Sequence, residues 1–401
     1  MKMRKLFFLP LLITIYLSSC TQQEEPMSVL IDRVFAVAEY QYTEMDKRLS
    51  EATLPKTISA EGDFVSSNIY WWCSGFYPGA LWYIYEYGQS DQVRELAEKN
   101  TFKLDSVRYV RTDHDVGFQL NCSYGNGLRL TANEAYKSVL YTGAKSLATR
   151  FNENTGTIKS WDFVRKNKDW KFPVIIDNMM NLELLMSMAT MFDDDSLRHI
   201  ACTHANTTIQ HHFRDDYTCF HLIDYDPQTG AVRNKETVQG FSDNSAWSRG
   251  QAWALYGYTM MFRMTDYQNY LLQAEHIADM LIQRLPEDGI PYWDFDAPDI
   301  PNALKDASAG SIMASAFIEL SKYTTDSKAK KNYLAIAEKQ LRALASEAYL
   351  APKDTNCNYI LKHSVGAIPD NAEIDVPLTY SDYYFLEALL RYKDILDKKD
   401  L

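Results

Sequence analysis

The chain has 401 residues, 46% of them hydrophobic, which is enough for one large core or two ordinary domains. Its net charge of −12 is spread along the chain and argues against a nucleic-acid-binding protein, which would carry a basic face. Aromatic residues make up 13%, including 27 Tyr and 8 Trp. Such a surplus often lines grooves for ring-shaped ligands such as sugars, although simple core filling explains most of these rings.

The N-terminus has the pattern of an export signal. The stretch MKMRKLFFLPLLITIYLSSC has a basic start, an apolar run of about a dozen residues and small residues before Cys20. LSSC is similar to the lipobox of bacterial lipoproteins, which predicts a signal over residues 1–20, lipidation of Cys20 and a polar tether over residues 21–27. An ordinary cleaved signal or a short membrane anchor is the alternative. We therefore expect an exported bacterial protein, periplasmic or attached to the outer membrane by its lipid.

Helical patterns recur through the rest of the chain, with no convincing strand-rich block and no second stretch near the ~18 apolar residues of a membrane span. After Asp177, for example, Leu182, Leu185 and Ala189 follow helical spacing. Similar stripes lie within 131–151 and around 334–344. Further helices are predicted at 27–50, 78–88, 91–103, 116–125, 195–212, 248–264, 267–285, 309–323 and 380–397.

About twelve helices in six hairpins, with the functional loops gathered at one end, predict an all-α fold, the (α/α)6 barrel or six-hairpin toroid. The long loops 213–247 and 286–308 carry Trp, Gly, Pro and Asp, as functional loops often do. No Pro/Ser-rich linker divides the chain after residue 26. We therefore expect residues 28–397 to form a single catalytic domain.

The cysteines and short motifs indicate neither a metal nor a cofactor. The cysteines beyond residue 20 have no CxxC spacing, and their odd number leaves at least one thiol free: Cys73, Cys122, Cys202, Cys219 and Cys357. The chain also lacks GxSxG, Walker, HExxH and GxGxxG motifs, and its acidic clusters lack EF-hand spacing. We predict no metal and no cofactor.

Two acids stand at matching junctions between a loop and a helix. Asp177 is the single carboxylate in the apolar stretch FPVIIDNMM, where it can be a helix N-cap or a catalytic acid whose pKa is raised by apolar surroundings. A capping box would place Glu or Gln at position 180, which is Met180. His114 and Asp115 precede a second helix start, with the same two interpretations open. The pair fits two carboxylates at the mouth of one barrel.

The stretch VQGFSDNSAWSRGQAWALYGY combines an arginine with an amide and indole rings. Arg249 and Trp253 share a helix face if the helix begins near Ser248, and Gln239 and Trp247 precede them. An arginine beside Trp rings suits a carboxylated sugar, since it can form a charge-assisted bond while the rings stack. A structural arginine at a Trp-anchored helix start is the alternative. His221 is a lone loop histidine that means little by itself.

Six motifs in one order resemble glycoside hydrolase family 88, the unsaturated glucuronyl hydrolases. They are HDVGF, IDNMMNLELL, SAWSRGQAWALYGY, YWDFDAP, DASAGSIMASAFIEL and YSDYYFLEALLR. The resemblance extends over about residues 28 to 397 and implies the (α/α)6 barrel. It also implies hydration of the C4=C5 double bond that polysaccharide lyases leave in a non-reducing uronic acid, instead of attack at the anomeric carbon.

The resemblance implies a role for each matching residue. Asp177 matches the general acid/base, which protonates C4 and then takes a proton from the water that adds at C5. Asp115 matches the second essential aspartate, which contacts the unsaturated sugar. Trp72 and Trp161 match stacking tryptophans, with Trp71 a rival of Trp72 by one position. The remaining matches, to positions around the unsaturated sugar, are His114, His221, Gln239, Arg249 and Trp253.

These observations predict a hydrolase that releases unsaturated uronic acid from lyase-made glycosaminoglycan disaccharides or short oligosaccharides. Three alternatives remain: a hydrolase of unsaturated galacturonyl-rhamnose or related pectin fragments, a non-catalytic sugar-binding lipoprotein, and a conventional inverting hydrolase of saturated chains. The loss of Asp115 or Asp177 would favour the non-catalytic alternative, and both are present. Oligomeric state, sulfation preference and linkage preference stay open.

Overall fold

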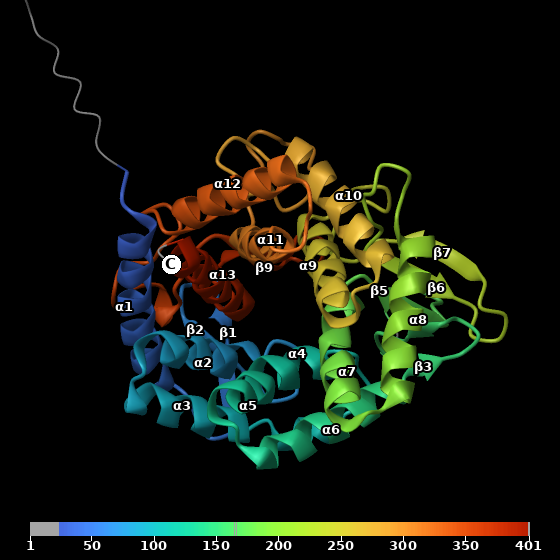
Figure 1. Ribbon diagram of the computed structural model, residues 1–401, viewed down its shortest axis with the longest axis horizontal. Helices are drawn as coiled ribbons and strands as arrows, with labels where there is room; N and C mark the ends of the chain where they lie inside the picture. Colours follow the sequence, from blue (N-terminus) through green and yellow to red (C-terminus); the bar gives the residue numbers. More distant parts are fainter. Residues whose placement is uncertain (1–23, 164, 166, 400–401) are drawn as a thin grey trace, which may run out of the picture.

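The computed structural model describes residues 24–163, 165 and 167–399. The predicted signal, Cys20 and the first part of the tether lie outside these residues. Within them the chain forms two concentric rings of helices (Figure 1). This is the (α/α)6 barrel predicted from the sequence. None of the described helices is long and apolar enough to cross a membrane.

The inner and outer rings alternate along the chain. The inner helices are α2 (Phe76–Gly88), α4 (Val116–Leu120), α5 (Asn126–Thr131), α7 (Asn178–Phe192), α9 (Ser248–Thr265), α11 (Ala307–Leu320) and α13 (Thr379–Lys399). A π-helical turn, Asn121–Gly125, joins α4 to α5 as one inner element. The outer helices are α1 (Met27–Asp46), α3 (Asp91–Phe102), α6 (Glu134–Ala148), α8 (Asp195–His212), α10 (Gln268–Arg284) and α12 (Ser327–Leu344).

Burial explains which helices lie inside. Every residue of α11 is buried, because this helix packs against α9, α12 and α13. In contrast, α12 buries only one stripe and turns its charged face outward. Because inner and outer helices alternate, the inner helices all begin at one end of the barrel. That end gathers the loops that carry the candidate site residues.

Short strands, which the sequence patterns did not predict, lie in the loops. The hairpins are β1–β2 (Thr53–Ile58, Phe64–Asn68), β3–β4 (Phe151–Asn152, Thr157–Ile158) and β8–β9 (Ser364–Ala367, Ala372–Val376); β5 (Phe172–Ile175), β6 (Leu222–Tyr225) and β7 (Val232–Glu236) form a three-stranded sheet. The strand β5 leads directly into α7, so the sheet sets the position at which α7 begins. All five described cysteines are free.

Candidate active site

Asp177 lies between β5 and α7, at the N-cap position of α7, yet its side chain makes no capping hydrogen bond. The residue is only 8% exposed, and its Oδ2 atom has no hydrogen-bond partner. The prediction that Asp177 stands at a helix start is confirmed, but the cap does not use its carboxylate. The side chain is therefore available for chemistry.

The surroundings of Asp177 favour a proton donor. Burial raises the pKa of its carboxyl to about 6, although the positive charge of Arg249 and the side chain of Trp253 oppose part of this rise. A carboxyl with this pKa carries its proton in a useful fraction of molecules near neutral pH. It can therefore give a proton and take one back.

The ring of His221 faces Asp177 in a defined neutral tautomer. Burial, with help from the charge of Arg249, lowers the pKa of His221 to about 3, so the ring is neutral. The backbone N–H groups of Val238 and Gln239 donate to Nδ1 over 3.0 and 3.3 Å, which leaves the ring proton on Nε2. This Nε2 lies 3.7 Å from Asp177 Oδ2 and has no hydrogen-bond partner. The N–H group is thus free to meet a ligand beside the acid.

Asp115 and His114 lie at the start of α4, next to the start of α7. Asn178 donates to the carbonyl of Ile158 over 2.7 Å, so its Oδ1 accepts from His114 Nδ1, 2.8 Å away. Burial lowers the pKa of His114 to about 4, and the neutral ring therefore presents a lone pair on Nε2, 3.5 Å from Asp115 Oδ1. Burial, followed by the charges of Asp113 and Asp177, raises the pKa of Asp115 well above its usual range.

The starts of α4 and α7 are held together by Asn181 and Gly117. The side chain of Asn181 accepts the backbone N–H of Phe118 over 2.7 Å. A Cβ atom on Gly117 would lie 2.5 Å from Asn181 Oδ1 and 2.6 Å from its Cα. Only glycine therefore allows this close approach, which brings Asp115 and Asp177 near enough for their charges to interact.

Arg249 is buried, and its N–H groups point to its own chain. It donates to Asp306 over 3.2 Å, to the carbonyl of Gly366 over 2.8 Å and to the carbonyl of Val365. The guanidinium also lies 4.5 Å from the centre of the Trp247 ring. Direct binding of a sugar carboxylate by Arg249 stays a prediction. The contacts give it a structural role, and its charge acts on Asp177.

The remaining predicted residues surround the same end of the barrel. The ring centres of Trp253 and Phe118 are 5.2 Å apart. The ring centres of Trp247 and His221 are 4.5 Å apart. The half-buried Trp72 contacts Phe118 and Tyr380, at 5.8 and 4.9 Å between ring centres. Its rival Trp71 instead lies under the ammonium group of Lys56.

Trp161 extends this aromatic surface towards the rim. Its ring lies 6.5 Å from His114 and stacks on Phe163 at 5.0 Å. Gln239 is half-buried and contacts His221 through its backbone. The structure therefore brings the predicted catalytic and binding residues to one end of the barrel. Their individual roles stay predictions.

Three residues of the site were not predicted as functional. Asn178 and Asn181 lie within DNMMN, where their spacing puts both at the first turn of α7, so that motif contained the signal. The ring centre of Tyr380 lies 5.3 Å from the guanidinium carbon of Arg249, and the buried hydroxyl of Tyr380 has no hydrogen-bond partner. Nothing in the spacing of YSDYY distinguishes its hydroxyls, so the sequence offered no basis for choosing Tyr380.

One group of described residues has the geometry to hold a metal ion. The ligand atoms of Asp113, His114 and Asp115 lie within 4.8 Å of one another. Two of these side chains already make hydrogen bonds within the chain, since Asp113 accepts the backbone N–H of Asp115 and His114 Nδ1 contacts Asn178. The absence of a metal and of a cofactor remains a prediction.

Comparison with known proteins identifies the family. A family model for Glycosyl Hydrolase Family 88 matches residues 43–391. The chain belongs to this family. It is therefore a glycoside hydrolase, as the six motifs predicted.

The curated relatives and solved structures agree with the family. An unsaturated glucuronyl hydrolase of Formosa agariphila is 47% identical over 331 residues, 82% of this chain and 81% of the relative. An unsaturated chondroitin disaccharide hydrolase of Streptococcus pyogenes is 33% identical over 80% of this chain and 82% of its own. The crystal structure of an unsaturated glucuronyl hydrolase specific for heparin is 42% identical, with a TM-score of 0.89 over 92% of this chain and 98% of that one.

Proposed function

We propose that this family 88 enzyme releases the 4,5-unsaturated uronic acid from the non-reducing end of lyase-generated glycosaminoglycan oligosaccharides. One observation carries the proposal: Asp177 is buried without a capping bond, has a pKa raised to about 6, and faces the free N–H group of His221. Such a carboxyl is suited to donate a proton to a carbon–carbon double bond and to recover it from water.

The reaction then proceeds in balanced steps. The protonated carboxyl of Asp177 transfers its proton to C4, and a water oxygen bonds to C5. The same water returns a proton to the Asp177 carboxylate, which regenerates the acid. The product at C5 is a hemiketal; it opens, the glycosidic bond breaks, and the remaining sugar is released.

The neighbours of Asp177 assist both protonation states. Burial favours the neutral acid before transfer, whereas the charge of Arg249 favours the carboxylate after transfer. Burial, with the charges of Asp113 and Asp177, raises the pKa of Asp115 and so favours its protonated form, which can donate a hydrogen bond to the sugar. The exposed parts of Trp72 and Trp161 offer flat apolar surfaces on which sugar rings can stack.

The substrate class rests on the relatives. Their names specify unsaturated glucuronyl, chondroitin disaccharide and heparin substrates. A solved structure of the Streptococcus agalactiae enzyme, 26% identical, holds dGlcA-GalNAc6S. These substrates share an unsaturated glucuronic acid, so we propose this sugar as the group that the enzyme recognises.

An ultraviolet assay tests the proposal. The purified protein is incubated separately with lyase-made disaccharides of chondroitin, heparin and pectin, and the absorbance of the conjugated double bond is followed. Loss of absorbance with the glycosaminoglycan disaccharides is the expected result. Loss with the pectin disaccharide alone would replace the substrate class, and a folded protein inactive on all three would refute the reaction.

We also propose that the enzyme is an exported lipoprotein attached through Cys20. The signal-like residues 1–20 support this proposal. Mass spectrometry of the mature N-terminus after expression in a bacterium tests it. A diacylglyceryl group on Cys20 is expected, and Cys20→Ala is expected to move the protein out of the membrane fraction. An unmodified N-terminus elsewhere would refute the anchor.

A further inference from the structure

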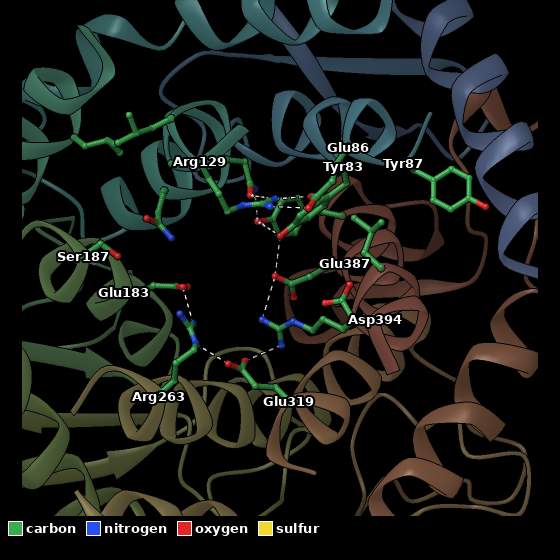
Figure 2. A pocket seen from close by; sticks show the side chains of 18 of the residues that line it. Tyr83, Glu86, Tyr87, Arg129, Glu183, Ser187, Arg263, Glu319, Glu387 and Asp394 are labelled. Carbon is green, nitrogen blue, oxygen red and sulfur yellow. Dashed lines mark hydrogen bonds and ion pairs between the residues drawn. The ribbon is translucent and has the colours of Figure 1, made fainter. Parts of the chain in front are cut away.

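A cavity of about 730 Å³ lies among the inner helices (Figure 2), and none of the candidate site residues lines it. Much of its lining comes from later turns of these helices, as shown by Glu86 near the end of α2, Arg263 near the end of α9 and Glu319 near the end of α11. The catalytic candidates instead precede or begin inner helices. The cavity therefore occupies the opposite end of the barrel.

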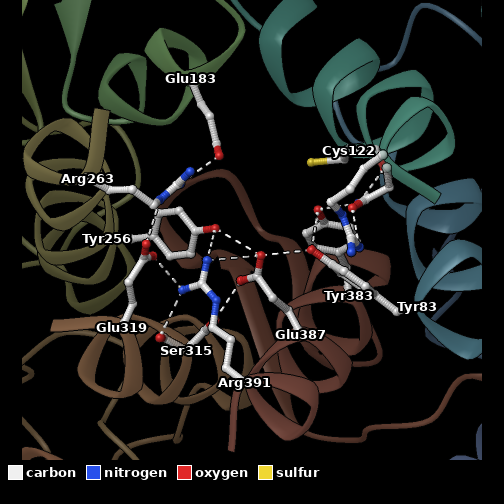
Figure 3. Close-up of polar contacts among 12 residues, drawn as sticks. Tyr83, Cys122, Glu183, Tyr256, Arg263, Ser315, Glu319, Tyr383, Glu387 and Arg391 are labelled. Atoms are coloured by element: carbon white, nitrogen blue, oxygen red, sulfur yellow. Dashed lines mark hydrogen bonds and ion pairs between the residues drawn. The ribbon is translucent and has the colours of Figure 1, made fainter. Parts of the chain in front are cut away.

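A chain of ion pairs along the cavity wall links four consecutive inner helices. Arg263 of α9 pairs with Glu183 of α7 at 2.7 Å and with Glu319 of α11 at 2.6 Å. Arg391 of α13 pairs with the other oxygen of Glu319 at 2.8 Å and with Glu387 at 3.3 Å. Figure 3 shows these side chains converging from separate helices. We call this set the inner belt: Glu183, Arg263, Glu319, Glu387 and Arg391.

The belt continues to the first two inner elements through hydroxyl groups. Tyr83 of α2 donates to Glu387 over 2.8 Å and lies 3.0 Å from the hydroxyl of Tyr383. Asn126 of α5 donates to that same hydroxyl over 3.1 Å. Polar contacts thus connect every element of the inner ring around the cavity.

Every carboxylate of the belt has an ion-pair partner, although Arg263 Nε and Glu319 Oε2 make no hydrogen bond. Glu387 accepts bonds from Tyr83, Tyr256 and Ser315 and also pairs with Arg391. Burial alone would raise the pKa of Glu319, but the charges of Arg391 and Arg263 hold it below its usual range. Each belt carboxylate is therefore already paired, and the belt is suited to hold helices rather than to bind a ligand.

Two of the helices that the belt joins hold residues of the candidate active site. Asp177 precedes α7, which also carries Glu183, while α9 carries Trp253, Tyr256 and Arg263. The hydroxyl of Tyr256 accepts from Arg391 over 2.9 Å and donates to Glu387 over 3.0 Å. The rings of Tyr256 and Trp253 both contact Tyr384, each at 5.4 Å. The belt thus reaches Trp253, whose side chain acts on Asp177.

We propose that the inner belt positions Asp177 and Trp253 for the reaction, with Glu183 and Arg263 as positioning residues. This inference rests on the proposed function, because it assigns the belt a role in that chemistry. Its physical basis is that small displacements of a catalytic group lower the rate steeply, roughly 10²-fold for about 1 Å. A shift of α7 against α9 moves the acid relative to Trp253 and Arg249.

Glu183→Gln tests the proposal, since it removes the charge that joins α7 to α9 and keeps the side-chain size. We expect kcat to fall about tenfold, KM to change less than about twofold, and the alkaline limb of the kcat/KM profile to move. The groups facing Asp177 (Arg249, His221, Trp253 and Asp115) are unaltered, so such a shift reports their geometry. Glu183→Asp keeps the charge and serves as a second variant if Glu183→Gln does not fold.

The matched control is Glu86→Gln. Glu86 lines the same cavity and forms a bidentate pair with Arg129, at 2.6 and 2.5 Å, but this pair joins α2 to α5 and touches neither α7 nor α9. We expect kcat and the pH profile to match those of the wild type. A lower melting temperature of Glu183→Gln with unchanged kcat and pH profile would overturn the proposal, because the belt would then be structural only.

A measurement without substrate separates failure of the belt from failure of the proposed function. The carboxyl of Asp177 is titrated by carbon-13 NMR in the wild type and in Glu183→Gln, and Asp177→Asn identifies its signal. A changed titration midpoint in Glu183→Gln supports positioning even if no unsaturated uronide is turned over. An unchanged midpoint, with the fold intact, overturns it.

Discussion

Asp177→Asn separates the catalytic role of this residue from its place at a helix start. Asparagine has the same shape and caps helices as well as aspartate, but it cannot donate an acidic proton. We expect kcat/KM to fall by at least about 10²-fold, the usual contribution of a general acid or base. The assay is the loss of ultraviolet absorbance from an unsaturated disaccharide.

The same substitution should stabilise the protein at neutral pH. Burial raises the Asp177 pKa from its ordinary value of 3.8 to about 6, so folding opposes ionisation of this group. The difference corresponds to up to about 3 kcal/mol. This cost is absent below pH 3.8, grows as pH rises towards 6, and persists above 6, since only the unfolded chain ionises freely in between. Asparagine never carries this cost.

Asp194→Asn is the matched control, because Asp194 is also a helix N-cap. Its carboxylate accepts the backbone N–H groups of Ser196 and Leu197 at the start of α8, and the hydroxyl of Ser196 leads the interactions that lower its pKa. Stability from Asp194 is therefore present above its unfolded pKa and lost in acid, the opposite of Asp177. We expect Asp194→Asn to lower the melting temperature, because the amide keeps the cap but loses the charge that pairs with Lys145, and to leave kcat unchanged. Near-normal activity of Asp177→Asn, or a loss of stability like that of the control, would refute the assignment.

Three further outcomes follow. The kcat/KM of the wild type should decline as pH rises through about 6, because the Asp177 proton donor ionises. His114 and His221 have pKa values of about 4 and about 3, so neither should add a limb to the pH–rate profile between pH 5 and 8. A rise of kcat/KM over that range would contradict this prediction. Gly117→Ala should lower the free energy of unfolding in denaturant by about 1–3 kcal/mol and also lower kcat, since the new Cβ would collide with Asn181. An unchanged free energy of unfolding with an unchanged kcat would show that α4 moves freely. Arg249→Leu should lower the free energy of unfolding in denaturant by about 3–5 kcal/mol, because it leaves the Asp306 carboxylate buried without its charged partner. A loss of substrate affinity at unchanged stability would instead support direct binding of the sugar carboxylate by Arg249.

The sequence predicted much of the secondary structure because helical periodicity is a local property. The stripe after Asp177 became α7, and the helix predicted near Ser248 begins at that residue. Boundaries were less accurate: the helix predicted for 27–50 ends at Asp46. The short strands were missed because pairs such as β3 and β4 are too brief to show an alternating pattern.

The candidate site was also largely visible in the sequence. The apolar neighbours of Asp177 predicted a raised pKa, which the buried carboxyl has. The motif HDVGF marked the second acid, and the packing of α4 against α7 brings Asp115 to within electrostatic range of Asp177. Short motifs identified these residues because each stands at the start of an inner helix, where local spacing and site geometry coincide.

Contacts between distant segments were decided by the tertiary structure alone. The tautomer of His221 depends on the backbone of Val238 and Gln239, and the bonds of Arg249 depend on β8. The inner belt has the same character, because Arg391 meets Glu319 only when α13 packs against α11. The sequence by itself determined the barrel, the family and the acid pair. Proton positions and charge pairing depended on how the rings fold together, because desolvation and ion pairing act through space and not along the chain.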